Sequence, residues 1–326
     1  MDLDFLQSSE WGEIKKPEWQ PLRVVIDDVP VSILTRKLPL LGKKFGYVPR
    51  GFNEQIFTSE LVKGLVDHCK NKLHLSHLVI EPNLDNQKEF ELLFKEIGFI
   101  NTGKTIQPNQ TYILDLSKSE EALWMDLRAS FRRNIKKSSA RFNCRVEKFE
   151  NGDEAVERFI LVSEKINTRK KFIKHTPAYF RKAWNILSPK GMAKIFIVVH
   201  EADGEKEDVA AYFLAYTKNE AFELYGGVTD SGKPLRAGHL LKWECIKDAK
   251  ASGLKLYDQW GVARFLGNDF DKNDELYYIT EFKSSFGGKY KEFLQQQTIV
   301  FDKMSCRIYN FLQKVNKLKL KLLKKV

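Results

Sequence analysis

Short runs of apolar and β-branched residues alternate with amphipathic helical segments along the whole chain, and this kind of series occurs twice. In the first half, strand-like runs at 31–36 and 75–80 flank a segment at 59–72 whose apolar residues recur at helical spacing. In the second half, strand-like runs at 193–200, 208–217 and 220–226 precede a helical segment at 237–252 and a further strand. The pattern predicts a mixed α/β (α+β) fold with two domains, joined near 143–151.

The length and composition agree with two globular domains. The chain has 326 residues, of which 43% are hydrophobic and 30% are charged. These values exclude collagen, low-complexity disorder and a disulfide scaffold. No run approaches the roughly 20 apolar residues of a membrane span, and the first residues lack the apolar core of a secretory signal. The four cysteines lie far apart and the histidines lack metal-ligand spacing, so we expect a cytoplasmic protein without a metal site.

The positive charge is unevenly distributed. Lysine and arginine number 54 against 43 acidic residues, which gives a net charge of +11. Cations concentrate at 128–141 and 165–182, and the tail at 314–326 holds six lysines and no acid. Such an excess favours nucleic acid, nucleotide phosphates or an anionic membrane as partners, and it does not choose among them. The alternative is that these segments form ordinary solvated faces.

Six motifs occur in a fixed order: an opening motif at 5–15, which consists of FLQS followed by WGEIK, then EP at 81–82, RRNI at 132–135, LYGG at 224–227, YDQWG at 257–261 and FKSSFGG at 282–288. In this order they resemble the FemABX family over about residues 5–309. Members of that family transfer an amino acid from aminoacyl-tRNA to an amine on the stem peptide of a muramyl-peptide precursor, in the synthesis of peptidoglycan. The precursor is UDP-MurNAc-pentapeptide or lipid II, and the resemblance does not choose between them.

The resemblance also implies a fold. Family members consist of two acetyltransferase-like (GNAT) domains packed side by side. Here these would be 1–145 and 146–301, with a C-terminal helix at 302–326 packing back on the first domain. No heptad pattern is sustained between 143 and 288, so the chain resembles the compact members that lack a coiled-coil arm. We expect a monomer.

The implied reaction is aminolysis of an activated ester by a bound amine, with no cofactor and no covalent enzyme intermediate. The resemblance places Lys283 near the reacting centre, where its charge would stabilise the oxyanion or the leaving alkoxide. Glu81 matches an acidic position that would orient the attacking amine. Without the resemblance, the sequence would predict that Lys283 is a solvated surface lysine and that Glu81 only marks the end of a strand.

The diphosphate of the precursor requires cations. Lys15 matches a phosphate-binding position of the family. Relatives have an arginine shortly before a Tyr-Phe pair, and here Lys174 or His175 would replace it ahead of Tyr179. Lysine lacks the bidentate geometry of arginine, so this replacement leaves the phosphate geometry open.

Two residues are expected to contact tRNA. The resemblance places an aromatic residue at Tyr225 to stack on the terminal adenosine, and Arg236 would meet a phosphate. Arg236 lies in a turn with a single following glycine, which is a weak signal for coenzyme A. A CoA-dependent N-acyltransferase and a non-catalytic RNA-binding protein therefore remain alternatives. The lysine-rich tail would dock on the first domain or contact an anionic membrane at its inner face.

Overall fold

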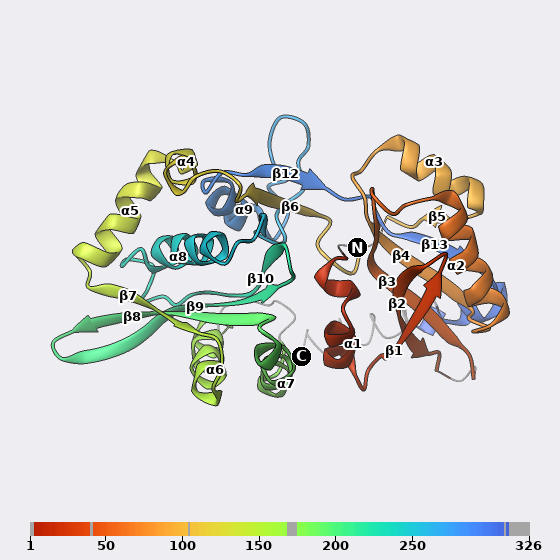
Figure 1. Ribbon diagram of the computed structural model, residues 1–326, viewed down its shortest axis with the longest axis horizontal. Helices are drawn as coiled ribbons and strands as arrows, with labels where there is room; N and C mark the ends of the chain where they lie inside the picture. Colours follow the sequence, from red (N-terminus) through yellow and green to blue (C-terminus); the bar gives the residue numbers. More distant parts are fainter. Residues whose placement is uncertain (1–2, 40–41, 104, 168–174, 310, 313–326) are drawn as a thin grey trace. The chain divides into compact units, whose positions relative to one another are not determined.

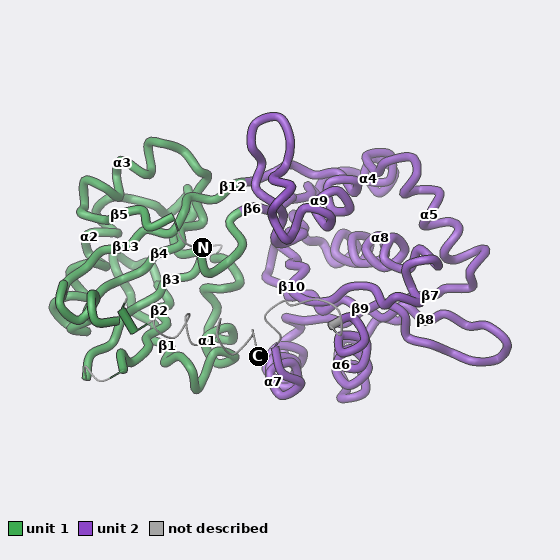
Figure 2. Tube along the Cα trace, turned by 180° about the vertical axis from the view of Figure 1, so that it is seen from behind, with its two compact units in different colours: residues 1, 3–109, 292–326 green, residues 2, 110–291 purple. Residues whose placement is uncertain are grey.

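The computed structural model describes residues 3–39, 42–103, 105–167, 175–309 and 311–312, and the chain divides into two compact units (Figure 2). Unit 1 contains residues up to Asn109 and the chain from Glu292 onward, and unit 2 contains Gln110–Lys291. The first unit is therefore completed by a C-terminal segment. The division differs from the expected one, because 110–145 belong to unit 2 and 292–301 belong to unit 1.

Unit 1 is built on one mixed sheet. Its strand order is β1 (Gln20–Ile26), β2 (Val29–Lys37), β3 (Lys44–Asn53), β4 (His77–Asn83), β13 (Gln297–Val300) and β5 (Ile100–Asn101). β3 and β4 pair in parallel, and the other neighbours pair antiparallel. The sheet thus combines a hairpin at one edge with a strand that returns from the end of the chain.

Helices and an N-terminal segment cover the two faces of this sheet. α2 (Ser59–Asn71) begins after Thr58, whose hydroxyl accepts from the Leu61 N–H. Its apolar side packs with Ile33 of β2 in the core, together with α3 (Lys88–Ile97). Ser32 points to the opposite face because side chains alternate along a strand. There its hydroxyl donates to the backbone carbonyl of Gln7 at 2.7 Å, in η1 (Phe5–Gln7), which leads into α1 (Ser9–Lys15).

Unit 2 contains a second mixed sheet. The strand order is β12 (Lys289–Glu292), β6 (Gln110–Asp115), β11 (Leu256–Asp258), β10 (Glu220–Val228), β9 (Glu205–Tyr216), β8 (Ala193–Ala202) and β7 (Cys144–Phe149). β10 and β11 are parallel, and they pair over only three residues of each strand. The short pairing leaves the rest of β10, including Tyr225, beside β9 alone.

Helices cover both faces of the second sheet (Figure 1). α8 (Ala237–Ala251) packs on one face, and α5 (Ala129–Ala140) packs on α8. α6 (Asp153–Asn167) and α7 (Pro177–Leu187) cover the other face, and α7 continues into η2 (Ser188–Lys190). Buried residues of α8 and the sheet form the main core of the unit. On the far side, Phe159 of α6 packs edge-on against Phe213 of β9.

Two predictions from the sequence are corrected here, and one helix was missed. The sequence from Ser119 onward predicts one long helix, but the structure has two, α4 (Glu120–Asp126) and α5. At the break between them the Arg128 N–H donates to the Ser285 carbonyl at 3.0 Å. The expected domain junction at 143–151 contains strand β7, which pairs with β8. The sequence reading also missed α9 (Tyr277–Ser284), the helix that carries Lys283.

The described C-terminal segment contacts unit 1. Residues 303–309 are helical. The Tyr309 ring lies 5.3 Å from the ring of Phe45 and 5.8 Å from that of His77, both in the sheet of unit 1. The tail at 314–326 lies outside the described residues. In the part of the chain that the structure describes, no helix is both long and apolar enough to cross a membrane.

Candidate functional site

Lys283 lies in the last turn of α9 and is buried, with 5% of its surface exposed. Its Nζ donates to the backbone carbonyl of Gly261 at 3.0 Å. Burial lowers the pKa of Lys283 to about 8, with Lys242 acting in the same direction and Glu223 and Asp258 opposing it. Lys283 is therefore not the solvated surface lysine that its local sequence suggests. It is a desolvated ammonium group whose pKa lies close to neutral pH, as is common at reactive sites.

A buried polar cluster next to Lys283 was not predicted from the sequence. Lys242 of α8 is fully buried, and its Nζ lies 3.1 Å from Oε2 of Glu223 on β10. The same Nζ donates to Oε1 of Gln259 at 2.9 Å, and the Tyr257 hydroxyl donates to Glu223 Oε2 at 3.0 Å. The signal available in the sequence was a lysine flanked directly by the apolar residues Leu240, Leu241 and Trp243.

Three of the predicted binding residues come together at α7 and β10. The Tyr179 and Tyr225 hydroxyl groups lie 2.8 Å apart. The His175 ring stacks on Tyr179 with 3.9 Å between centroids and an interplanar angle of 12°. Thr176 caps α7 by accepting from the Tyr179 N–H, which fixes the start of the helix. Burial is the main reason that the pKa of Tyr225 is raised well above its usual value, and Tyr179 adds to the effect. Lys174 lies outside the described residues.

The backbone beside Tyr225 requires glycine. β10 carries an irregularity between Glu223 and Tyr225, and Gly226 follows with φ of +136°. A Cβ at Gly226 would lie 2.1 Å from the Ala211 carbonyl oxygen. Glycine is therefore needed for a close backbone approach, and the approaching group is the neighbouring strand β9.

Lys15 and Glu81 both belong to unit 1. Lys15 ends α1 and is half-buried, with its Nζ 3.9 Å from the centroid of the Trp11 ring. Burial lowers the pKa of Lys15 to about 8, and the Glu18 carboxylate partly opposes this. A cation held over an aromatic face in a partly desolvated place is well suited to bind an anion.

Glu81 of β4 is buried, and both of its carboxylate oxygens accept hydrogen bonds. The donors are the Tyr47 hydroxyl and the backbone N–H groups of Ile106 and Gln107. Burial raises the pKa of Glu81, and these hydrogen bonds oppose the rise. The contacts favour an anchor for the 106–107 segment over the amine-orienting role expected from the sequence.

Arg236 caps α8 in a left-handed conformation with φ of +59°, and its side chain is exposed. The backbone N–H groups around it are used within the turn: Ala237 N–H donates to the Gly232 carbonyl, and His239 N–H donates to the Arg236 carbonyl. A pyrophosphate cradle at a helix start needs such N–H groups to point at the ligand. This turn therefore gives little support to coenzyme A binding.

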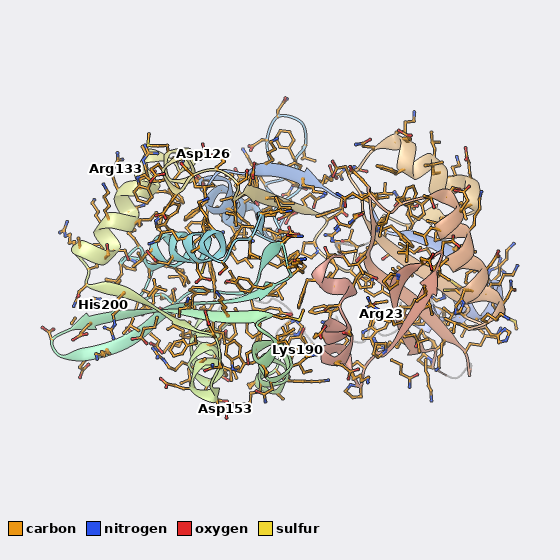
Figure 3. The ribbon with its side chains drawn as sticks, in the orientation of Figure 1. Arg23, Asp126, Arg133, Asp153, Lys190 and His200 are labelled. Carbon is orange, nitrogen blue, oxygen red and sulfur yellow. The ribbon has the colours of Figure 1, made fainter. Side chains whose placement is uncertain are left out.

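The basic residues of 128–141 divide into two groups. Arg132 donates to the backbone carbonyl of Met125 at 2.9 Å and to that of Leu127, so it caps the end of α4. Arg133, Lys136 and Lys137 are exposed on α5, which contains no acidic residue. Arg133 is labelled in Figure 3. The described part of this helix therefore presents a cationic face, without a contact that identifies its partner.

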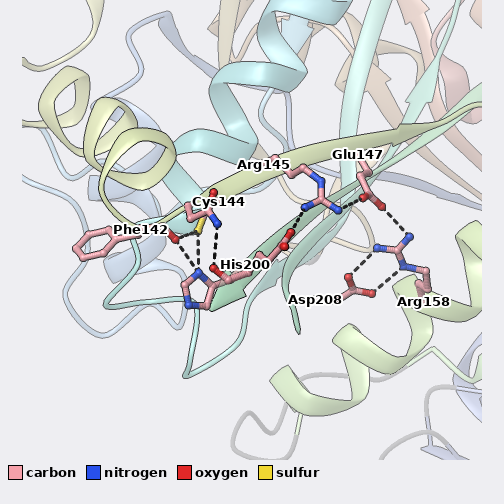
Figure 4. A network of polar contacts seen from close by, with 9 residues as sticks. Phe142, Cys144, Arg145, Glu147, Arg158, His200 and Asp208 are labelled. Atoms are coloured by element: carbon pink, nitrogen blue, oxygen red, sulfur yellow. Dashed lines mark hydrogen bonds and ion pairs between the residues drawn. The ribbon is translucent and has the colours of Figure 1, made fainter. Parts of the chain in front are cut away.

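The cavity of about 720 Å³ in unit 2 is a different feature from the predicted site. It lies beside α6, β7 and β9, and its lining includes Arg145, Glu147, Arg158 and Asp208. Arg158 donates to Asp208 through Nε at 2.9 Å and Nη2 at 2.7 Å, and to Glu147 through Nη1 at 2.8 Å (Figure 4). These central charges are paired with one another. Of the predicted site residues that the structure describes, none lines the cavity. Among the described residues, no cluster of three or more metal-ligating side chains occurs.

Comparison with known proteins agrees with the sequence resemblance. The FemAB family model matches residues 194–314. Lipid II:glycine glycyltransferase of Staphylococcus epidermidis is 22% identical over 387 aligned positions, covering 96% of this chain and 91% of that protein. The enzyme of the same name from Staphylococcus aureus is also 22% identical, covering 87% and 85%. The longer alignment means that the S. epidermidis enzyme contains residues that this chain lacks.

Solved structures show the same fold. The crystal structure of FemX superimposes with a TM-score of 0.82 at 19% identity, covering 94% of each chain. A tandem GNAT protein from the clavulanic acid biosynthesis pathway gives a TM-score of 0.53 at 10% identity, covering 87% of this chain and 84% of that one. The fold is thus a pair of GNAT-like domains. In unit 2 the longest described helices have 15 residues, too few for a coiled-coil arm. The family-model match over residues 194–314, the relatives aligned over most of the chain and the FemX fold together show that this chain is similar to proteins of the FemABX family.

Proposed function

We propose that this chain is an aminoacyltransferase that joins an amino acid, carried as an ester on tRNA, to the stem-peptide amine of a muramyl-peptide precursor of peptidoglycan. The observation that carries the proposal is Lys283, a buried lysine with a pKa of about 8 in a motif that resembles the FemABX family. The names of the relatives state that they transfer glycine to lipid II, which supports the same reaction class here.

The chemistry requires an amine to attack an ester carbonyl, an oxyanion to form, and the ribose oxygen to leave. Protonated Lys283 has three N–H donors, and the hydrogen bond to Gly261 uses one of them. The remaining donors can stabilise the oxyanion or the leaving oxygen. With a pKa of about 8, Lys283 is mostly protonated at neutral pH and releases a proton to the leaving oxygen more readily than an ordinary lysine.

A direct attack is favoured over a covalent enzyme intermediate. Cys144 Sγ lies 3.9 Å from Nδ1 of His200, which resembles a nucleophile–base pair (Figure 4). However, the same Nδ1 lies 2.7 Å from the Phe142 carbonyl oxygen, so it carries a proton and donates it there. Burial also raises the pKa of Cys144, which disfavours the thiolate.

The other residues receive roles in binding. We assign Lys15 to a phosphate of the precursor, and we assign Tyr179 and His175 to binding of the precursor as well. Tyr225 would stack on the terminal adenosine of tRNA, and Arg236 would contact a tRNA phosphate. The protein would act as a cytoplasmic monomer without a cofactor, with its basic tail able to contact the inner face of the membrane where the precursor is lipid-linked.

The proposal is tested with the purified full chain and tRNA charged with radiolabelled amino acids. UDP-MurNAc-pentapeptide and lipid II serve as acceptors in separate reactions, and mass spectrometry identifies the amide formed. We expect one charged tRNA to label at least one acceptor, and nuclease treatment of the tRNA to abolish labelling. Acyl transfer from acetyl-CoA without any transfer from charged tRNA would overturn the proposal. Salt-sensitive RNA binding with no transfer to either acceptor would also overturn it.

A further inference from the structure

The Lys242–Glu223 ion pair lies in the protein interior, where an ion pair adds little to the stability of the fold. Lys242 is fully buried, Glu223 is nearly so, and their charged atoms lie 3.1 Å apart. Removing two charges from water costs several kcal/mol for each ion, and the attraction between them seldom yields a net gain over apolar packing. Stability alone therefore does not explain this pair, and its contacts indicate a second role.

Lys242 contacts both segments that define the surroundings of Lys283. Its Nζ donates to Gln259, which lies two residues before Gly261, the acceptor of the Lys283 ammonium. The same Nζ lies 5.4 Å and 5.3 Å from the ring centroids of Phe282 and Phe286, which flank Lys283 in sequence. The amide of Gln259 also donates to the Gly287 carbonyl at 3.2 Å. One ammonium group thus ties the 259–261 segment to the end of α9.

The charges around Lys283 come from three elements. Glu223 on β10 and Asp258 on β11 favour its protonated form, and Lys242 on α8 disfavours it. The Asp258 carboxylate is held by the Trp260 N–H at 2.6 Å and by the Thr111 hydroxyl. Lys242 and Glu223 therefore act on Lys283 with opposite signs from within one ion pair.

We propose that Lys242 and Glu223 are positioning residues that hold Lys283 against Gly261 and balance its charge. This inference rests on the catalytic role proposed for Lys283. The pair would affect the reaction through Lys283, and neither residue would contact the substrate.

The opposite signs give a test that a purely structural role would not satisfy. Lys242→Met removes the cation that repels the Lys283 ammonium, whereas the Glu223 carboxylate that attracts it remains. This variant should therefore raise the pKa of Lys283. Glu223→Gln removes the favourable carboxylate and should lower that pKa. Each displacement should be about one pH unit for a unit charge in a desolvated site. The double variant should return close to the wild-type value.

The pKa is measured by NMR titration of ¹³Cε-labelled lysine in the full chain, with the Lys283 signal assigned by its loss in Lys283→Met. This readout needs no substrate, so it remains informative if the proposed transfer reaction is wrong. Lys247→Met on the same helix, where Lys247 pairs with Glu244, is the matched control and should leave the titration unchanged. Displacements of Lys242→Met and Glu223→Gln in the same direction, or none in either, would overturn the inference.

An uncharged variant tests the positioning part and guards against misfolding of the charge variants. Gln259→Leu removes the link from Lys242 to the 259–261 segment without removing a charge. We expect it to lower the transfer rate at saturating substrate by roughly tenfold, with KM values changed by less than about twofold. An unchanged rate would contradict the positioning role. A fractional loss of rate equal to the fractional loss of folded protein would contradict it as well.

Discussion

The hydroxyl oxygens of Tyr179 and Tyr225 lie 2.8 Å apart, although Tyr179 belongs to helix α7 and Tyr225 to strand β10. The His175 ring stacks on the Tyr179 ring, with 3.9 Å between the ring centroids. A residue expected to bind the precursor therefore lies against one expected to bind tRNA. This adjacency is what an enzyme needs if the amine of one substrate is to reach the ester of the other.

The stacking role of Tyr225 predicts a selective effect on tRNA. Tyr225→Ala should raise KM for aminoacyl-tRNA roughly 5- to 150-fold, because one base–aromatic stack is worth about 1–3 kcal/mol. Tyr225→Phe keeps the ring and should change that KM by less than about fivefold. Steady-state kinetics with charged tRNA measure both values. Tyr278→Ala, at a tyrosine that is 84% exposed, is the control. A folded Tyr225→Ala protein with the wild-type KM would exclude the stacking role.

The phosphate role of Lys15 predicts a pH-dependent affinity for the precursor. The pKa of Lys15 is lowered to about 8, so the ammonium is present below pH 8 and is lost as pH rises through it. Binding of UDP-MurNAc-pentapeptide, measured by calorimetry without tRNA, should weaken between pH 7 and pH 9. Lys15→Arg should bind equally across this range because arginine stays charged. Affinity of the wild type that does not change with pH would contradict the assignment.

The contacts of Glu81 predict a loss of stability rather than of chemistry. Glu81→Gln should lower the free energy of unfolding by about 1–3 kcal/mol, because the glutamine NH₂ cannot accept from both the Tyr47 hydroxyl and the Gln107 N–H, which share one carboxyl oxygen of Glu81. Because burial raises the folded-state pKa of Glu81, the wild type loses stability as pH rises through the interval between its unfolded and folded pKa values. The deficit of Glu81→Gln should therefore be largest at acidic pH and should shrink as pH rises.

Urea unfolding at several pH values checks this prediction, and kcat per folded molecule should stay within about twofold of wild type. A hundredfold loss of kcat with unchanged stability would instead restore the amine-orienting role of Glu81.

Local patterns predicted the elements that depend on nearby residues. The sequence pattern predicts helices over 153–167 and 177–187, and α6 and α7 have these bounds; Thr176 and Pro177 supply the capped start of α7. The break at Arg128 depends on the carbonyl of Ser285, which is distant in sequence, so the local pattern there continues as one helix. The return of β13 to the sheet of unit 1 is likewise a long-range pairing, with β4.

The candidate site was predictable where a residue type and a family motif coincide. Lys283, Tyr225 and Lys15 were named in this way. The Lys242–Glu223 pair was not, because burial of a lysine depends on partners at Glu223 and Gln259 that only the folded chain brings to it. The engagement of Glu81 with Tyr47 has the same origin, since β3 and β4 become neighbours only in the sheet.

The central claim is tested most directly by single-turnover transfer of a radiolabelled amino acid from charged tRNA to the muramyl-peptide precursor. Wild type, Lys283→Met and the exposed-site control Lys289→Met are compared at pH 7.5. We predict labelled amide with wild type and the control, and a rate about 100- to 1,000-fold lower for Lys283→Met at an unchanged unfolding temperature. Transfer by Lys283→Met within twofold of wild type would contradict its catalytic role, and no transfer by wild type would contradict the proposed function.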